Sequence, residues 1–274
     1  STSTCPTCAG KRPLLEKCKQ YYRILSSTRR TFELGTRPDG PHPLEMNEQE
    51  CSFSPATFGA LNSFTRSRLA SILEFAASMF PEFALLNKEE KWQLAVSFSY
   101  RLLSFEGSYR SEKLFPDDRE KSFASYTCYF SHEMVDGFFN DLPSHHAKQT
   151  MEHANKVLRD YIDLILPARH VIRRAAPDNE EFHAVLLYLF WFIEGTHMRD
   201  EIVRVADGYR AAVLQEMHCY YREELGLSDY ATRVGELFTL ILHFERNEDL
   251  KEHFEIYRLL GVFTDDTFVY QLQK

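Results

Sequence analysis

The sequence predicts an all-α fold, a sandwich of helices around an apolar interior. Apolar residues recur at spacings of three and four along most of the chain, as on one face of a helix. Neither strand–helix alternation nor a repeat of fixed length interrupts this pattern. Two segments, 184–193 and 237–244, are apolar nearly all round. Such helices are typical of the centre of a layered domain, so we expect both to be buried.

Local signals place the individual elements. Helices are expected at 13–30, 58–80, 87–109, 130–142, 144–174, 178–192, 196–225 and 229–260, with a short last helix at 268–272. Short polar residues that accept bonds from free N–H groups mark helix starts at Asn87, Asp178 and Ser228. Gly226 and Gly261 mark helix ends. Residues 34–55 are expected to form a loop, and 113–128 is the one place where a short β-hairpin is expected.

Composition limits the classes of function. Of the 274 residues, 44% are hydrophobic and 26% charged, which is typical of globular domains. The formal net charge of −8 argues against direct binding of nucleic acid, which needs a basic face. The longest apolar run is about half of the ~20 residues that span a bilayer. The six cysteines are irregularly spaced and the N-terminus is polar. We therefore expect a soluble intracellular domain with reduced thiols.

Motifs for chemistry are weak. Cys5 and Cys8 have the spacing of a zinc knuckle or redox pair, but no second pair completes four ligands. We interpret them as thiols of a terminal segment. His145, His146 and His153 lack the H-E-x-x-H pattern and are expected on the surface. No nucleophile has an obvious local base. The sequence therefore predicts no catalytic residue, no metal site and no cofactor.

Two features leave alternatives open. Arg110 follows a long apolar stretch, where a charge needs a partner. It is either a structural ion pair with Glu106, one turn earlier, or an anchor for a ligand carboxylate. The short helix at 268–272 is too apolar and too short to persist alone in water. It either closes the core or acts as a mobile lid.

Several segments, taken in order, resemble a known family. The stretch E-F-A-A at 74–77, the stretch P-E-F at 81–83 and the segment 86–94 resemble the signature of nuclear receptor ligand-binding domains. Residues 181–186, 257–261 and 266–272 are similar to that family's eighth helix, the end of its penultimate helix and its activation helix. Segments 80–83 and 108–111 resemble the nematode-expanded receptors related to hepatocyte nuclear factor 4.

The resemblance implies a three-layer antiparallel sandwich of about ten to twelve helices around a lipophilic pocket. It implies a domain at 13–274 with an activation helix at 264–274, after a flexible segment at 1–12. It also implies a nuclear transcription factor that binds a lipophilic ligand, fatty acids included, and coregulator peptides. Homodimers or heterodimers are expected, with DNA bound by a zinc-finger domain outside this chain and no contact with membranes.

Site residues follow from the same resemblance. The ligand-binding positions are Leu61, Phe64, Thr65, Arg68, Leu69, Leu103, Arg110, Leu250, Phe254 and Tyr257. The coregulator groove corresponds to Leu73, Ala77, Trp92, Phe268, Val269, Gln271 and Leu272. The dimer face, for which a core role is an alternative, corresponds to Val234, Leu237, Phe238 and Ile241.

The chain departs from the family at the charge clamp that holds a coactivator helix. Ala77, or Ser78 in another alignment, stands where the family has lysine, and Gln271 stands where it has glutamate. Weakened conventional coactivator docking follows, which leaves a repressor, a constitutive factor or an unusual coregulator preference open. Two alternatives to a ligand-regulated domain are an orphan scaffold with a pocket filled by side chains and an unrecognised all-helical enzyme.

Overall fold

The computed structural model describes residues 12–37, 40–42, 53–142, 146–193, 198–245 and 255–263. Most of these residues are helical, which confirms the predicted all-α class. The helices are α1 (Pro13–Thr36), α2 (Phe58–Met79), η2 (Pro81–Leu85), α3 (Lys88–Leu114), η3 (His132–Gly137), α4 (Lys148–Ile165), α5 (Ala168–Ala175), α6 (Asn179–Phe190), α7 (Asp200–Cys219), η4 (Tyr220–Glu224) and α8 (Ala231–Glu245). The strands are β1 (Ser54–Pro55), β2 (Ser122–Phe123) and β3 (Cys128–Phe130).

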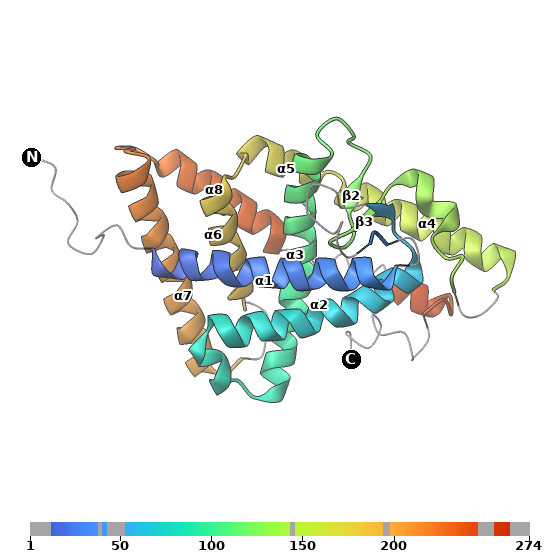
Figure 1. Cartoon of the computed structure of the whole chain (residues 1–274), viewed down its shortest axis with the longest axis horizontal. Helices are drawn as coiled ribbons and strands as arrows, with labels where there is room; N and C mark the ends of the chain where they lie inside the picture. Colours follow the sequence, from blue (N-terminus) through green and yellow to red (C-terminus); the bar gives the residue numbers. More distant parts are fainter. Residues whose placement is uncertain are drawn as a thin grey trace, which may run out of the picture.

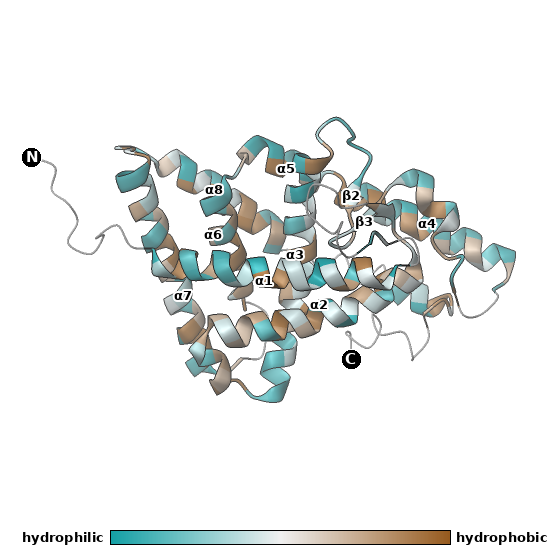
Figure 2. Ribbon diagram, viewed as in Figure 1, coloured by the Kyte–Doolittle hydropathy of each residue, from teal (hydrophilic) through white to brown (hydrophobic). Residues whose placement is uncertain are grey.

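The helices form three layers (Figure 1). Helix α1 crosses the face of the molecule and packs on α2 and α6. Helices α3 and α6 pack on each other in the middle, and α8 contacts both of them together with α5. Apolar residues gather on the helix faces that are turned toward other helices (Figure 2). The buried core therefore runs through the middle layer, as the predicted sandwich requires.

Side-chain caps begin the middle helices where the sequence predicts them. The Asn87 side chain accepts a hydrogen bond from the Glu90 N–H, and Glu90 accepts one from the Asn87 N–H, both at 2.9 Å. Asp178 and Glu181 form the same reciprocal pair at the start of α6. Each pair satisfies two N–H groups that a helix start leaves free.

Helix α1 is longer than predicted. It runs to Thr36, and Glu33 and Leu34 are buried, so the expected loop at 34–55 is wrong at its start. It is also wrong at its end, because Ser54 pairs with Cys128 in a parallel β1–β3 ladder. Burial in the tertiary structure outweighs the turn-forming residues that follow. The helix ends at Arg37, which is extended, as expected of a residue before proline.

Two other predicted helices are divided. The helix expected at 144–174 consists of α4 and α5, which are separated at Pro167, where the proline ring removes a hydrogen bond and disfavours a continuous helix. The helix expected at 130–142 is the end of β3 followed by the 3-10 helix η3. The predicted β-hairpin is confirmed, since β2 and β3 pair antiparallel with Ser122 opposite Phe130.

The two helices expected at the centre behave differently. Residues of α6 are buried almost throughout, which confirms the prediction for its part of 184–193. Helix α8 buries one face only, since Leu240 is buried while Leu242 is 52% exposed. The prediction for 237–244 is therefore wrong, because α8 lies in an outer layer. Gly226 and Gly261 have φ of 63° and 68° at the ends of helical segments, as expected for glycine.

The described residues carry few other chemical features. Cys18 and Cys128 are free and buried, whereas Cys219 is disulfide-bonded, so the expectation of reduced thiols is wrong for Cys219. Among the described helices, none has the length and hydropathy to cross a membrane. Within the same residues, no three His, Cys, Asp or Glu side chains gather as a metal site would require. Cys5, Cys8 and His145 lie outside the described residues.

Candidate ligand-binding site

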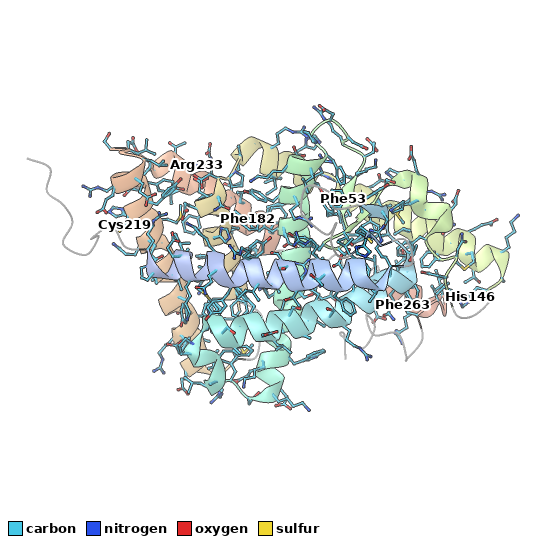
Figure 3. All side chains as sticks on the ribbon, in the orientation of Figure 1. Phe53, His146, Phe182, Cys219, Arg233 and Phe263 are labelled. Atoms are coloured by element: carbon cyan, nitrogen blue, oxygen red, sulfur yellow. The ribbon has the colours of Figure 1, made fainter. Side chains whose placement is uncertain are left out.

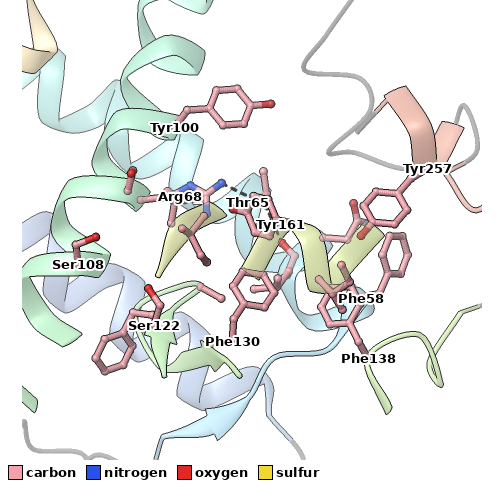
Figure 4. A pocket seen from close by; sticks show the side chains of 18 of the residues that line it. Phe58, Thr65, Arg68, Tyr100, Ser108, Ser122, Phe130, Phe138, Tyr161 and Tyr257 are labelled. Carbon is pink, nitrogen blue, oxygen red and sulfur yellow. Dashed lines mark hydrogen bonds between the residues drawn. The ribbon is translucent and has the colours of Figure 1, made fainter. Parts of the chain in front are cut away.

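A cavity of about 110 Å³ lies between α2, α3, α4, the β2–β3 hairpin and the segment 255–263. Its walls are mainly aromatic and aliphatic, with a few hydroxyl groups and one guanidinium (Figure 4). Phe263, at the end of the molecule opposite to Arg233 (Figure 3), closes one wall and packs against Phe58 and Tyr257. Such a lining suits a lipophilic molecule that carries a small number of polar atoms.

Half of the predicted ligand-binding residues line this cavity. They are Leu61, Thr65, Arg68, Leu103 and Tyr257. The first three lie on α2 at spacings of four and three, which places them on one face of that helix.

Other predicted residues lie elsewhere. Phe64 is buried and packs edge-on against Phe32, and Leu69 is buried in the main core, so neither lines the cavity. Leu250 and Phe254 lie outside the described residues.

Sequence reasoning missed the wall that α4 contributes. Leu158, Tyr161 and Ile165 of α4 line the cavity, as do Phe130 and Phe138 from the hairpin and the residues after η3. The amphipathic spacing along α4 does indicate a buried face. That spacing does not indicate which other helix the face contacts, so no local signal could assign these residues to the site.

Arg68 is the charged group of the cavity. Its side chain is 5% exposed. Its Nε donates to Ser99 Oγ at 2.8 Å and its Nη2 donates to Thr65 Oγ1 at 3.4 Å. Burial lowers the pKa of Arg68 to about 10, so the guanidinium remains protonated at neutral pH.

Arg110, one of the predicted ligand-binding residues, does not line this cavity. Its guanidinium carbon lies over the rings of Phe123 and Tyr126, 4.3 Å and 3.8 Å from their centroids. One of its nitrogens, Nη1, is buried without a hydrogen-bond partner. Arg110 therefore makes cation–π contacts, and it does not form the ion pair with Glu106 that was one of the two alternatives. The Glu106 carboxylate pairs instead with Arg29.

A buried polar network beside the cavity joins α1 to α3. Glu106 accepts hydrogen bonds from Arg29 Nη1 at 2.8 Å and from the Tyr22 hydroxyl at 2.6 Å. Burial by itself would raise the pKa of Glu106. The charges of Arg29 and Arg110 outweigh this effect, so the pKa of Glu106 lies below its ordinary value. The carboxylate is therefore ionised, and it compensates the buried Arg29 charge.

A second carboxylate of α1 holds the turn between β2 and β3. Glu33 accepts hydrogen bonds from the Tyr126 N–H at 3.1 Å and the Thr127 N–H at 2.7 Å. The hydroxyls of Ser125 and Thr127 also donate to it, both at 2.9 Å. Because Phe123 and Ala124 of the same hairpin line the cavity, Glu33 fixes part of its wall.

The predicted coregulator groove is described only in part. Leu73 is half-buried, Ala77 and Ser78 are exposed, and Trp92 is 37% exposed. Phe268, Val269, Gln271 and Leu272 lie outside the described residues, as does the predicted activation helix at 264–274. Among these described positions, Trp92 is the large apolar side chain that is left partly exposed.

The four predicted dimer-face residues line a second cavity, of about 220 Å³, between α6, α7 and α8. Leu237 and Ile241 are buried, and Val234 and Phe238 are half-buried. Phe238 packs edge-on against Tyr188 of α6, with ring centroids 5.9 Å apart. The core interpretation therefore applies to Leu237 and Ile241.

Comparison with known proteins identifies the family. Residues 47–260, well over half of the chain, match the model of the ligand-binding domain of nuclear hormone receptors, a non-enzymatic domain of transcription factors. The fold is similar to that of the Ultraspiracle ligand-binding domain from Drosophila melanogaster, with a TM-score of 0.58 and 14% identity over 95% of this chain and 97% of that one. No curated protein matches. The chain therefore belongs to the family of nuclear hormone receptor ligand-binding domains.

Proposed function

We propose that the cavity between α2, α3, α4 and the hairpin binds a lipophilic small molecule, and that this binding regulates a transcription factor. The observation that carries the proposal is the open volume of about 110 Å³ inside an aromatic wall. A void of roughly 10–15 Å³ is enough for one water molecule, so this space is much larger than a packing defect. An apolar molecule gains free energy by leaving water for such a cavity.

The second candidate is an orphan domain that acts as a scaffold or repressor with its pocket filled by its own side chains. The many rings around the cavity favour it, since Phe58, Phe130 and Phe138 are among the large side chains that line the space. The two candidates differ in a measurable way. A ligand-regulated domain is stabilised by a lipid that binds only the folded state, and a filled scaffold is not.

The coregulator surface is proposed to include Leu73, Ala77 and Trp92, with Phe268, Val269, Gln271 and Leu272 supplied by an activation helix at 264–274. Trp92 supports this assignment because it is a large apolar side chain left 37% exposed. Neither Ala77 nor Gln271 supplies a charge for the peptide's helix dipole. We therefore propose weak binding of conventional coactivator peptides.

The wider biological context is also a proposal. We propose a nuclear receptor of the nematode-expanded group related to hepatocyte nuclear factor 4, with the ligand-binding domain at 13–274. Its DNA contacts would be made by a zinc-finger domain outside this chain. The support is the resemblance of 80–83 and 108–111, together with the acidic charge of −8. A dimer through α8 is proposed to use the half-buried Val234 and Phe238.

A cavity-filling variant tests the ligand proposal. Leu61→Trp adds an indole to a half-buried position that lines the cavity. Leu242→Trp, at a position 52% exposed on α8, is the matched control. We expect lipids to raise the melting temperature of the wild type and of the control but not of Leu61→Trp. Lipid stabilisation that is equal in all three proteins would place binding outside this cavity and refute the proposal.

A further inference from the structure

The second cavity, of about 220 Å³, is separate from the first one. The two cavities share no lining residue. In Figure 1, α7 and α8 diverge from their junction at η4, and α6 lies between them. Helix α6 packs on both of these helices. It therefore forms the floor of a space whose sides are α7 and α8.

This cavity has a buried floor and a partly open mouth. The floor residues come from α6, α7, η4 and α8, and they are Ala184, Val185, Val213, Met217, Tyr221, Leu237 and Ile241. At the mouth, Leu214 is 38% exposed, and Val234 and Phe238 are half-buried. The mouth gives a small molecule a route from solvent to the buried floor.

The volume of the second cavity is larger than that of a packing defect. A void of roughly 10–15 Å³ holds one water molecule, and an apolar cavity of about 150 Å³ is enough to bind benzene. Atoms at the wall of an empty cavity lack contact partners, so a guest that fills the space gains dispersion energy. It also moves from water to an apolar environment. A space of about 220 Å³ therefore suits a molecule of one or two rings.

The lining selects against a charged guest. Among the described residues that line this cavity, none is an aspartate, glutamate, lysine or arginine. The Tyr221 hydroxyl donates to Glu181 at 2.8 Å, and the Tyr230 hydroxyl is joined to Nδ1 of His218 by a hydrogen bond. Because these polar atoms are already engaged, an ionised guest would lose its water without gaining a counter-ion.

Aromatic side chains make the lining suitable for a ring. Tyr188 and Phe238 pack edge-on with centroids 5.9 Å apart, and Tyr221 stacks on Tyr230 with centroids 5.2 Å apart. A further ring adds to such an array through edge-to-face or offset contacts. The lining therefore favours a flat apolar molecule.

We infer that the cavity between α6, α7 and α8 is a second binding site, which takes an uncharged aromatic or alicyclic molecule of one or two rings. The inference goes beyond the proposed function and does not depend on it, because the first cavity is a different space. Val234 and Phe238 line the mouth and are also proposed as dimer contacts. A second copy of the chain is therefore the competing occupant of this surface.

Methionine methyl NMR locates the guest in the wild-type domain. Met217 lines the second cavity, Met134 packs in the core around the first one, and Met79 is buried and lines neither. Toluene is the probe, and its ring current should shift the Met217 methyl resonance but not that of Met79. Benzoate, in which a carboxylate replaces the methyl group of toluene, should leave Met217 unshifted at the same concentrations.

Three results of this experiment would overturn the inference. The first is a Met217 resonance that does not move at concentrations of toluene up to its solubility. The second is an equal shift with benzoate. The third is a shift at Met134 alone, which would place toluene in the first cavity only.

Cavity-filling variants provide an independent test. Val213→Trp adds an indole to a floor position of the second cavity and should weaken toluene binding about tenfold or more, since it removes the space in which the ring is buried. Leu61→Trp, which fills the first cavity, should leave the toluene-induced shift of Met217 unchanged. Loss of this shift in Leu61→Trp but not in Val213→Trp would contradict the assignment.

Melting temperatures show whether the space is present without any ligand. Val213→Trp should melt no lower than the wild type, because the added ring enters an existing cavity. Ile202→Trp is the matched control, since Ile202 is buried on the same helix and lines neither cavity. Overpacking should lower the melting temperature of this control by at least about 2 °C. An equal fall in both variants would mean that the cavity is closed in solution.

Sedimentation equilibrium tests the second copy as the occupant. If toluene shifts Met217 in the monomer, the cavity takes a small molecule and the inference stands. If the wild-type monomer shows no such shift and Val213→Trp abolishes a dimer, the cavity belongs to the dimer interface and the inference is wrong. If Val213→Trp does not fold, the comparison of toluene with benzoate in the wild type still decides the question.

Discussion

Glu106 is the residue whose neutralisation should destabilise this domain most clearly. Its carboxylate is 1% exposed, and it compensates Arg29, which is also 1% exposed. The Arg29 Nε and Nη2 atoms are already buried without hydrogen-bond partners. In Glu106→Gln the amide keeps the shape of the side chain but not its charge. The guanidinium is then a buried charge without its counter-ion, which is the costly outcome for such pairs.

The expected loss of stability is about 3–5 kcal/mol, the usual effect of removing one partner of a buried ion pair. Domains of this kind have a total unfolding free energy of about 5–15 kcal/mol, so the loss is a large fraction. The melting temperature should fall by about 10 °C, since each kcal/mol corresponds to roughly 2–4 °C for domains of 150–250 residues. Urea unfolding followed by circular dichroism measures the free energy directly.

A double variant separates the cost of an unpaired charge from the loss of contacts. Arg29→Met with Glu106→Leu removes both charges and keeps apolar volume at each position. Because apolar replacement of a buried pair is often neutral or stabilising, the double variant should be more stable than Glu106→Gln alone. If Glu106→Gln lowers the unfolding free energy by less than about 1 kcal/mol, the loss of Glu106 does not leave Arg29 as a costly buried charge, and the reasoning is wrong.

Further predictions concern the hairpin turn and the start of α3. Glu33→Gln should lower the unfolding free energy by about 2–3 kcal/mol, because the turn between β2 and β3 loses a charged hydrogen-bond acceptor. The amides of Tyr126 and Thr127 should then exchange faster with deuterium, and unchanged exchange would contradict this. Hydrogen bonds from Arg199, against a smaller opposing effect of burial, lower the pKa of Glu90 to about 2 from an ordinary 4.5. Its contribution to stability should therefore be complete above pH 4.5 and decline as the pH falls toward 2. Urea unfolding across that range should show a steeper loss in the wild type than in Glu90→Gln, and parallel curves would refute the assignment.

Elements with strong local signals are predicted well by the sequence. Asn87 and Asp178 are followed three residues later by Glu90 and Glu181, and this pattern alone forms the reciprocal caps of α3 and α6. A hairpin at 113–128 is also predicted, because the composition there interrupts the helical spacing, although β3 extends beyond this range to Phe130. These features need only a few neighbouring residues, so they can be predicted without knowledge of the fold.

Elements decided by distant contacts are predicted poorly. The end of α1 is an example, since residues 37–41 favour a turn while Glu33 is held by a turn more than ninety residues away. The all-round apolar appearance of 237–244 is another, because only packing decides which face of α8 is covered. Local sequence patterns contain no information about these contacts, because the contacts form only when elements far apart in the sequence pack together.

The candidate site contains residues that local spacing predicts and residues that only distant contacts place. Leu61, Thr65 and Arg68 share a face of α2, so helix periodicity alone brings them together once one of them is placed. Arg110 illustrates the limit. Its distance from Glu106 suggests a pair, but the Glu106 carboxylate is taken by Arg29 of another helix. Which arginine faces the cavity depends on how α2, α3 and the hairpin pack, and the sequence of α3 contains no signal for it.

Native mass spectrometry of the purified domain, followed by organic extraction and identification of lipids, tests the central claim most directly. If the cavity that Leu61 and Arg68 line is a ligand site, the spectrum should show one bound lipophilic molecule per chain, and Leu61→Trp should lose that mass while Leu242→Trp keeps it. A spectrum of the chain alone, together with no change of melting temperature across a panel of lipids, would contradict the account and favour the filled-pocket scaffold.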